Sequence, residues 1–121
     1  MKTALVIDDN RNTADSLCQM LDLLDVYTKA AYSPRGAMLM LAEFTPNIVF
    51  VDINMPGVTG FEVLSYVKRD PRLENIPVVF VTSDDQEETL KRAKEGGAFS
   101  LIVKPASFDT LEKVLKAAKI I

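Results

Sequence analysis

Four short runs of apolar residues, rich in valine and isoleucine, constrain the fold of this chain more than any other feature. They cover residues 4–7, 47–51, 76–81 and 101–103, and none alternates with polar residues. Uninterrupted runs of this length are typical of parallel strands that are buried on both faces, because helices cover both sides of their sheet. A fifth run, residues 26–31, is more polar and carries a lysine, which an edge strand tolerates. We therefore expect five strands, four of them buried.

Helical patterns fill the intervals between these runs. Ser33-Pro34 is typical of a cap followed by the first turn of a helix, which we expect to continue through Phe44. Between about residues 11 and 24, apolar residues recur at spacings of three and four and predict one buried helical stripe, formed by Ala14, Leu17, Cys18, Leu21 and Leu24.

The three remaining helices differ in how many apolar residues they offer to a core. One is expected over residues 57–68 and ends at Asp70-Pro71, because the residue before a proline disfavours the helical conformation. The segment 84–95, capped by the glycines at 96 and 97, has only Leu90 and Ala93 as inward-facing candidates, so we expect it to be the least anchored helix. The last helix follows a Ser107 cap, and its stripe is Phe108, Leu111, Leu115 and Ala118.

Strands and helices thus alternate strictly along the chain, five of each. This order predicts right-handed crossovers and an α/β fold with a doubly wound parallel sheet. A chain of 121 residues fits one such domain. Ligands of doubly wound sheets bind outside the carboxyl ends of the strands, so those ends are where we look for function.

The composition removes several classes of chemistry. The chain has no histidine, which excludes Ser-His-Asp catalysis, histidine-ligated metal sites and a histidine pH switch. Its one cysteine, Cys18, excludes an internal disulfide and suits a reducing cytosol. A net charge of −3 argues against nucleic-acid binding, and the first apolar run is too short for a signal peptide or a membrane span. We expect a cytoplasmic protein whose chemistry depends on carboxylates, hydroxyls, lysines and backbone groups.

Polar residues stand directly after four of the predicted strands. Three of them are carboxylates, and like charges in one crevice raise one another's pKa values unless a cation neutralises them. Hard oxygen ligands with room for phosphate oxygens are the environment of Mg²⁺. A lysine and a hydroxyl at the same edge can bind an anion beside the metal, which predicts a phosphoryl ligand. These strand-end residues are Asp8-Asp9, Asp52, Thr82-Ser83 and Lys104-Pro105.

A carboxylate can itself attack phosphorus and form an aspartyl phosphate. Asp52 is the best candidate, because it stands alone after a central strand, whereas the pair Asp8-Asp9 is better suited to a metal. Such a site needs little covalent machinery, since positioning and charge neutralisation dominate phosphoryl transfer.

The same residues form four motifs that resemble the receiver domain of two-component response regulators. The resemblance covers essentially the whole chain and implies that residues 1–121 form one receiver domain. It also implies a flavodoxin-like sandwich of five strand-helix pairs, with strand order 2-1-3-4-5. The motifs are Val6-Ile7-Asp8-Asp9, residues 51–56 with Gly60 following, Val81-Thr82-Ser83, and Val103-Lys104-Pro105.

The resemblance implies a role for each strand-end residue. Asp52 is expected to be the phosphoacceptor, and Mg²⁺ is expected to bind Asp9, Asp52 and the backbone carbonyl of Asn54, with Asp8 acting largely through metal-bound water. Lys104 is expected to bind one phosphoryl oxygen and Thr82 to hydrogen-bond another, moving inward when the phosphate arrives.

Three further positions follow from the resemblance. The peptide bond before Pro105 is expected to be cis, a state that proline makes accessible. Asn54 and Asp84 match positions that tune the lifetime of the phosphoryl group. The segment Thr82-Ser83-Asp84 is also expected to form a capping box for the following helix.

The function implied is signal transduction in a phosphorelay. A histidine kinase or phosphotransfer protein donates a phosphoryl group to Asp52, and the modified domain changes its binding to a downstream protein. The domain is expected to catalyse only its own phosphorylation and dephosphorylation, and to be a monomer or a phosphorylation-dependent dimer.

One residue departs from the family pattern. Leu101 occupies the position where receivers usually carry the tyrosine or phenylalanine that moves with the threonine, and Phe99 lies two residues away. The alternative hypothesis is therefore an interaction module in which the phosphate is weakly coupled to the surface. A phosphatase for external substrates is disfavoured, because Asn54 stands where a second acid is needed and 121 residues leave no cap over the substrate.

Overall fold

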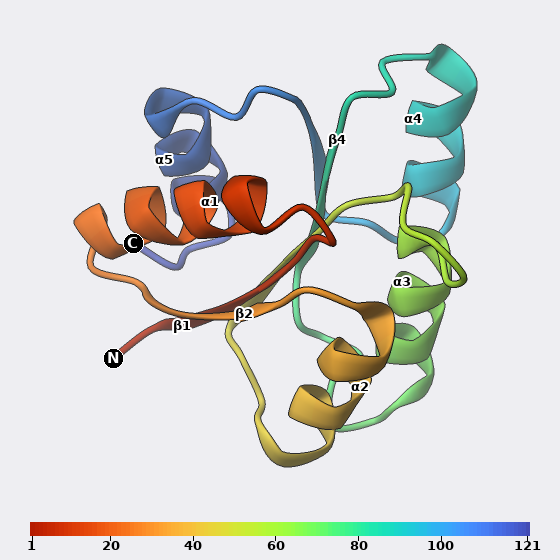
Figure 1. Ribbon diagram of the computed structural model, residues 1–121, viewed down its shortest axis with the longest axis horizontal. Helices are drawn as coiled ribbons and strands as arrows, with labels where there is room; N and C mark the ends of the chain where they lie inside the picture. The colour runs from red at the N-terminus through yellow and green to blue at the C-terminus, as the bar shows by residue number, and fades with distance from the viewer.

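The computed structural model describes all of residues 1–121 and contains five strands and five helices in strict alternation (Figure 1). The strands are β1 (Thr3–Ile7), β2 (Tyr27–Ala31), β3 (Ile48–Val51), β4 (Val78–Thr82) and β5 (Ser100–Val103). The helices are α1 (Arg11–Leu23), α2 (Pro34–Glu43), α3 (Gly60–Arg69), α4 (Glu87–Glu95) and α5 (Phe108–Ala117).

All strand pairs are parallel, and the sheet order is β2-β1-β3-β4-β5. This order confirms the flavodoxin-like topology expected for the chain. The register pairs Ile7 with Val51, and Thr82 with Val103. The carboxyl ends of the four strands β1, β3, β4 and β5 therefore meet at one edge of the sheet.

Helices cover both faces of the sheet. In Figure 1, α1 and α5 lie on one side, and α2, α3 and α4 lie on the other. Each side has its own apolar cluster, and neighbouring strand residues such as Val6 and Ile7 belong to opposite clusters because successive side chains of a strand point to opposite faces. All the side chains of β3 and β4 are buried, as their uninterrupted apolar runs predicted.

The fifth, more polar run forms the edge strand β2, as expected. Its side chains are mostly exposed or half-buried, and only Ala31 is fully buried. The lysine tolerated there has a local role, since the Lys29 ammonium lies 4.7 Å from the centre of the Phe44 ring after α2. This cation-π contact ties the edge strand to the neighbouring helix layer.

The predicted helix caps are largely confirmed. Ser33 and Ser107 accept hydrogen bonds from the backbone N–H groups of Gly36 and Thr110, in the first turns of α2 and α5. Asp70 is extended, which ends α3 before Pro71. Gly97 has a φ of +89°, the left-handed conformation that favours glycine after a helix.

The starts of α3 and α4 were predicted too early. Gly57 has a φ of +85° and cannot belong to a right-handed helix, so α3 begins at Gly60. Helix α4 begins at Glu87 instead of residue 84, and its cap residue Gln86 makes no side-chain capping bond. The expected capping box at residues 82–84 was therefore wrong, because Asp84 uses its carboxylate in the loop before the helix.

Two residues expected to face the core are exposed. Leu90 of α4 is 52% exposed, which leaves Ala93 as the one buried residue of that helix. Phe108 at the start of α5 is also largely exposed, whereas Leu111 and Leu115 are fully buried as predicted. None of the helices is long and apolar enough to span a lipid bilayer.

Candidate functional site

The edge where the strand ends meet carries the polar residues that the sequence singled out. Asp8 and Asp52 directly follow the paired residues Ile7 and Val51, and the Asp52 backbone N–H donates to the Ile7 carbonyl across 3.0 Å. The parallel register thus places the two carboxylates side by side. Asp8, Asp52 and Thr82 are the three buried polar residues of the chain, whereas Asp9 is exposed.

Three carboxylates converge at this edge. One oxygen from each of Asp8, Asp9 and Asp52 lies within 4.8 Å of the others. Oxygen donors at this spacing, with one of the three open to solvent, fit a hard divalent cation that keeps several of its waters. The donor set therefore suits Mg²⁺ better than a metal that prefers nitrogen or sulfur ligands.

Lys104 brings a positive charge to the two buried carboxylates. Its ammonium lies 3.0 Å from Asp8 Oδ2 and 3.5 Å from Asp52 Oδ2. Its backbone N–H donates to the carbonyl of Thr82 across 2.8 Å, and the peptide bond to Pro105 is cis, as expected. The turn after β5 thus directs the lysine side chain toward the ends of β1 and β3.

The electrostatics of the site favour binding of a further cation. Burial raises the pKa of Asp52 above its ordinary value, and the charge on Asp8 raises it further, while Lys104 opposes both effects. A raised pKa means that burial and the neighbouring negative charge disfavour the ionised carboxylate, so added positive charge would stabilise it. A divalent cation at this position would supply that charge.

The loop after β3 is shaped by close backbone contacts. The Asn54 backbone N–H donates to Asp52 Oδ1 across 3.3 Å, and the Asn54 residue itself is exposed. A Cβ atom on Gly60 would lie 2.6 Å from the Asp52 carbonyl oxygen, so only glycine lets the start of α3 approach this loop. The motif glycine is therefore required by the close packing of α3 beneath Asp52.

Of the predicted tuning and switch positions, Thr82 and Asp84 lie at this edge, whereas Leu101 pairs with Phe80 further back in the sheet. Thr82 Oγ accepts a hydrogen bond from the Asp84 backbone N–H across 3.2 Å. Leu101 is partly buried and packs against the core on the α3 and α4 side. Phe99 is 44% exposed just before β5, so this ring does not fill the place of an inward-facing aromatic residue.

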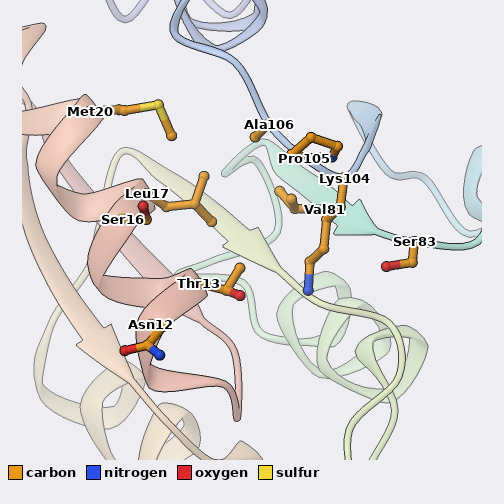
Figure 2. Close-up of a pocket in the computed structure, with 10 residues that line it drawn as sticks. All are labelled: Asn12, Thr13, Ser16, Leu17, Met20, Val81, Ser83, Lys104, Pro105 and Ala106. Carbon is orange, nitrogen blue, oxygen red and sulfur yellow. The ribbon is translucent and has the colours of Figure 1, made fainter.

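A cavity of about 480 Å³ opens beside Lys104, between α1 and the turn after β5. Figure 2 shows residues of α1 on one side of this cavity and Lys104 and Pro105 on the other. Its wall combines hydroxyl and amide groups with apolar side chains, among them Met20 and Ala106. No sequence motif predicted this cavity; the only local signal was a cluster of small polar residues in the first turns of α1, at Asn12, Thr13 and Ser16.

Comparisons with known proteins show the family to which this fold belongs. The family model for the response regulator receiver domain matches residues 4–116. The chain is 30% identical over 117 residues to protein PilH of Pseudomonas aeruginosa, covering 97% of each chain. Its fold superimposes on chemotaxis protein CheY4 of Vibrio cholerae with a TM-score of 0.92 at 25% identity, covering 98% of both chains.

One of the relatives is much longer than this chain. The chain is 35% identical over 112 residues to a probable cyclic di-GMP phosphodiesterase of Vibrio cholerae. That alignment covers 91% of this chain and only 25% of the phosphodiesterase. The similarity therefore concerns the receiver part of that protein. On the family match and the shared topology, the chain belongs to the response regulator receiver domains, the signalling modules of two-component systems.

Proposed function

We propose that this chain, over residues 1–121, is a phosphoacceptor module that takes a phosphoryl group onto Asp52 from a phosphohistidine of a histidine kinase or phosphotransfer protein. The observation that carries the proposal is the convergence of three carboxylates with one lysine. The oxygens of Asp8, Asp9 and Asp52 lie within 4.8 Å of one another, and Lys104 reaches both buried members. An ordinary solvated cluster of acids needs neither burial nor a lysine at its centre.

The carboxylates of Asp8, Asp9 and Asp52 and the backbone carbonyl of Asn54 are the groups that would hold Mg²⁺. When bound, the ion would neutralise negative charge on the phosphoryl oxygens. Its binding requires the Lys104 ammonium to share Asp8 and Asp52 with it. The long lysine side chain, which is about one fifth exposed, has the freedom to do so.

The chemical step uses an ionised Asp52. One carboxylate oxygen attacks phosphorus, the bond from phosphorus to the donor imidazole nitrogen breaks, and the nitrogen keeps the electron pair and takes up a proton. Lys104 binds one oxygen of the transferred group and the Thr82 hydroxyl donates to another, so both act on charge that spreads over the equatorial oxygens. The domain is the acceptor in its own modification and has no separate substrate to turn over.

The cavity beside Lys104 offers a place for the donor protein. Lys104, which reaches Asp8 and Asp52, is part of its lining, and Met20 and Ala106 give it an apolar wall that a donor protein can cover. Met20→Glu should slow transfer from a phosphohistidine protein by at least about tenfold, the effect of burying an unpaired charge in an interface, while labelling by acetyl phosphate stays unchanged. Leu39→Glu, on the exposed face of α2, is the matched control. Equal slowing by both variants would argue against docking at this cavity.

The decisive test of the proposed function is labelling by acetyl phosphate with Mg²⁺, followed by mass spectrometry of the intact protein. The wild type should gain one phosphoryl group, and Asp52→Asn should gain none. That variant should stay folded, because burial already disfavours the charge that it removes. Labelling that persists in Asp52→Asn would sink the assignment of the acceptor.

The second candidate, an interaction module that is weakly coupled to its phosphate, is favoured by one observation. The side chain at the usual aromatic position is Leu101, and the nearby Phe99 ring stays exposed. This candidate predicts normal labelling of Asp52 with no change in the affinity of a downstream protein. A change in affinity on phosphorylation would exclude it.

A further inference from the structure

A basic groove lies between α3 and α4, two helices on the same side of the sheet (Figure 1). This α3–α4 groove has a volume of about 400 Å³. Its charged lining residues are three cations, Lys68, Arg69 and Arg92, and one acid, Glu95. The groove is therefore a local concentration of positive charge in a chain whose net charge is −3.

The three cations have no carboxylate partner within the chain. None of the five ion pairs of the chain involves them. The Lys68 ammonium donates to the neutral backbone carbonyl of Glu74 across 3.2 Å, and the Arg92 guanidinium stacks on the Phe61 ring at 4.0 Å. Arg69 is exposed. The positive charges of the groove are thus available to an anion from outside the chain.

Stabilisation of the helix ends accounts for only part of this charge. Lys68 and Arg69 lie in the last turn of α3, and Arg92 lies in the last turn of α4. Cations at these positions interact favourably with the carbonyl ends of the helices, and each end is equivalent to about half a negative charge. The two helix ends together with Glu95 still leave the groove positive.

The floor of the groove is apolar. Leu64 is buried there, and the half-buried Phe61 ring lies beside it. A Cβ atom on Gly96 would lie 3.0 Å from Leu64 Cδ2, so glycine lets the end of α4 approach α3 closely. The groove therefore combines a narrow apolar floor with cations contributed by both helices.

We propose that the α3–α4 groove binds an acidic peptide segment of a partner protein. Carboxylates of the segment pair with Lys68, Arg69 and Arg92, and an apolar side chain between them packs against the Phe61 ring. Complementary charges at such a rim guide association and fix the register of the segment. The concave shape and the negative net charge of the chain disfavour a flat anionic membrane or an extended nucleic acid. The site does not use Asp52, so it goes beyond the proposed function.

The test is an NMR titration of the full chain with the peptide Glu-Asp-Leu-Glu-Asp, because chemical shifts detect weak binding and locate it. The peptide should shift the amides of residues 64–69 and 92–96, and the shifts should disappear in about 1 M salt, where the Debye length is ~3 Å. The uncharged peptide Gln-Asn-Leu-Gln-Asn is the control and should not bind. Absence of binding by the acidic peptide, or equal binding of both peptides, would overturn the proposal.

Three charge variants should change the affinity in different directions. Arg69→Gln should weaken binding about two- to fivefold, the effect of one exposed ion pair, and Glu95→Gln should strengthen it by a similar factor because it removes the acid from the groove. Arg35→Gln is the matched control, since Arg35 is also exposed and in no ion pair but lies on α2. Equal weakening by Arg35→Gln and Arg69→Gln would contradict a specific site.

Two further measurements separate this inference from other partners and from the proposed function. Heparin and phosphatidylglycerol vesicles should shift the groove amides less than the peptide does. Stronger shifts with either would show a general polyanion site and overturn the assignment to a peptide. Asp52→Asn should bind the peptide as the wild type does. Peptide binding without acetyl phosphate labelling in the wild type would overturn the proposed function and leave this inference standing.

Discussion

Helices α4 and α5 pack on opposite faces of the same end of the sheet and are fixed in different ways. Helix α5 buries Leu111, Val114 and Leu115, and Ser107 caps its first turn. Helix α4 buries Ala93 alone, and its cap residue makes no side-chain bond. The two helices are of similar length, so the difference lies in what each buries.

This difference separates two kinds of stabilisation. Burial of large apolar side chains is worth several kcal/mol and has no alternative partner in the folded state. Hydrogen bonds and cation-π contacts at a surface are worth about 1 kcal/mol and can be exchanged for others. Helix α5 is therefore part of the fixed core, and α4 is held by contacts that can be exchanged for others.

The largest expected difference between the two helices concerns their leucines. Leu111→Ala should lower the free energy of unfolding by about 2–5 kcal/mol, because it leaves a cavity in a fully buried site. Leu90→Ala should change it by less than about 0.5 kcal/mol. Urea unfolding of both variants measures the contrast, and similar losses would mean that α4 is anchored as firmly as α5.

The second largest difference is expected between the N-terminal caps of the two helices. Ser107 Oγ accepts from the Thr110 backbone N–H across 3.1 Å, so Ser107→Ala should cost about 0.5–2 kcal/mol. Gln86→Ala removes no capping bond from α4 and should be close to neutral. Thermal unfolding of the pair is the measurement. A loss at Gln86 as large as at Ser107 would contradict the difference in capping.

The contact that replaces apolar burial in α4 is the stacking of Arg92 on Phe61. The guanidinium carbon lies 4.0 Å from the centre of the ring, and the Phe61 ring packs edge-on against the buried Phe80 at 5.1 Å. Arg92→Met should lower stability by about 0.5–1 kcal/mol and speed exchange of the α4 amides. Lys91→Met, at the exposed neighbouring position, is the control and should do neither.

The smallest expected effect is a pH dependence of the stability of the first turns of α4. The Thr89 hydroxyl and then the Gln86 N–H hold the pKa of Asp84 below its ordinary value. A carboxylate with a lowered pKa stabilises the folded state above its ordinary pKa, and that contribution is lost as the pH falls through the lowered value. Carbon NMR titration should show the Asp84 pKa rising toward its ordinary value in Thr89→Val. An unchanged value would mean that the contact is not formed in solution.

Much of the fold could be predicted from the sequence because its signals are local. The five strands lie within two residues of the predicted runs, since continuous apolar stretches are buried wherever helices cover both faces. The starts of α3 and α4 could not be predicted in this way. Gly57 adopts a positive φ that its neighbours do not reveal, and the Asp84 side chain bonds to Thr89 instead of capping a helix at residue 84.

The residues of the site, like the elements of the fold, could be predicted only where a local sequence signal exists. The meeting of Asp8, Asp9, Asp52, Thr82 and Lys104 at one edge could be predicted, because each lies at the end of a predicted strand and parallel strands end at one edge. The chemical role of each residue stays a prediction. The cavity could not be predicted, because its walls come from residues as far apart in sequence as Ser16 and Ala106. The exposure of Phe108 and Leu90 could not be predicted for a similar reason. Helical spacing shows which residues share one face of a helix, but it does not show whether another element covers that face.

The sequence by itself determined the alternation of strands and helices and the set of chemical groups at the strand ends. Apolar periodicity and the residue types that follow each strand are properties of neighbouring residues, so they are readable without a structure. Only the tertiary structure decided that Lys104 bridges Asp8 and Asp52, and that Thr82 is linked through Asp84 to α4. Those contacts depend on side-chain directions and on the packing of distant segments, which no local pattern encodes.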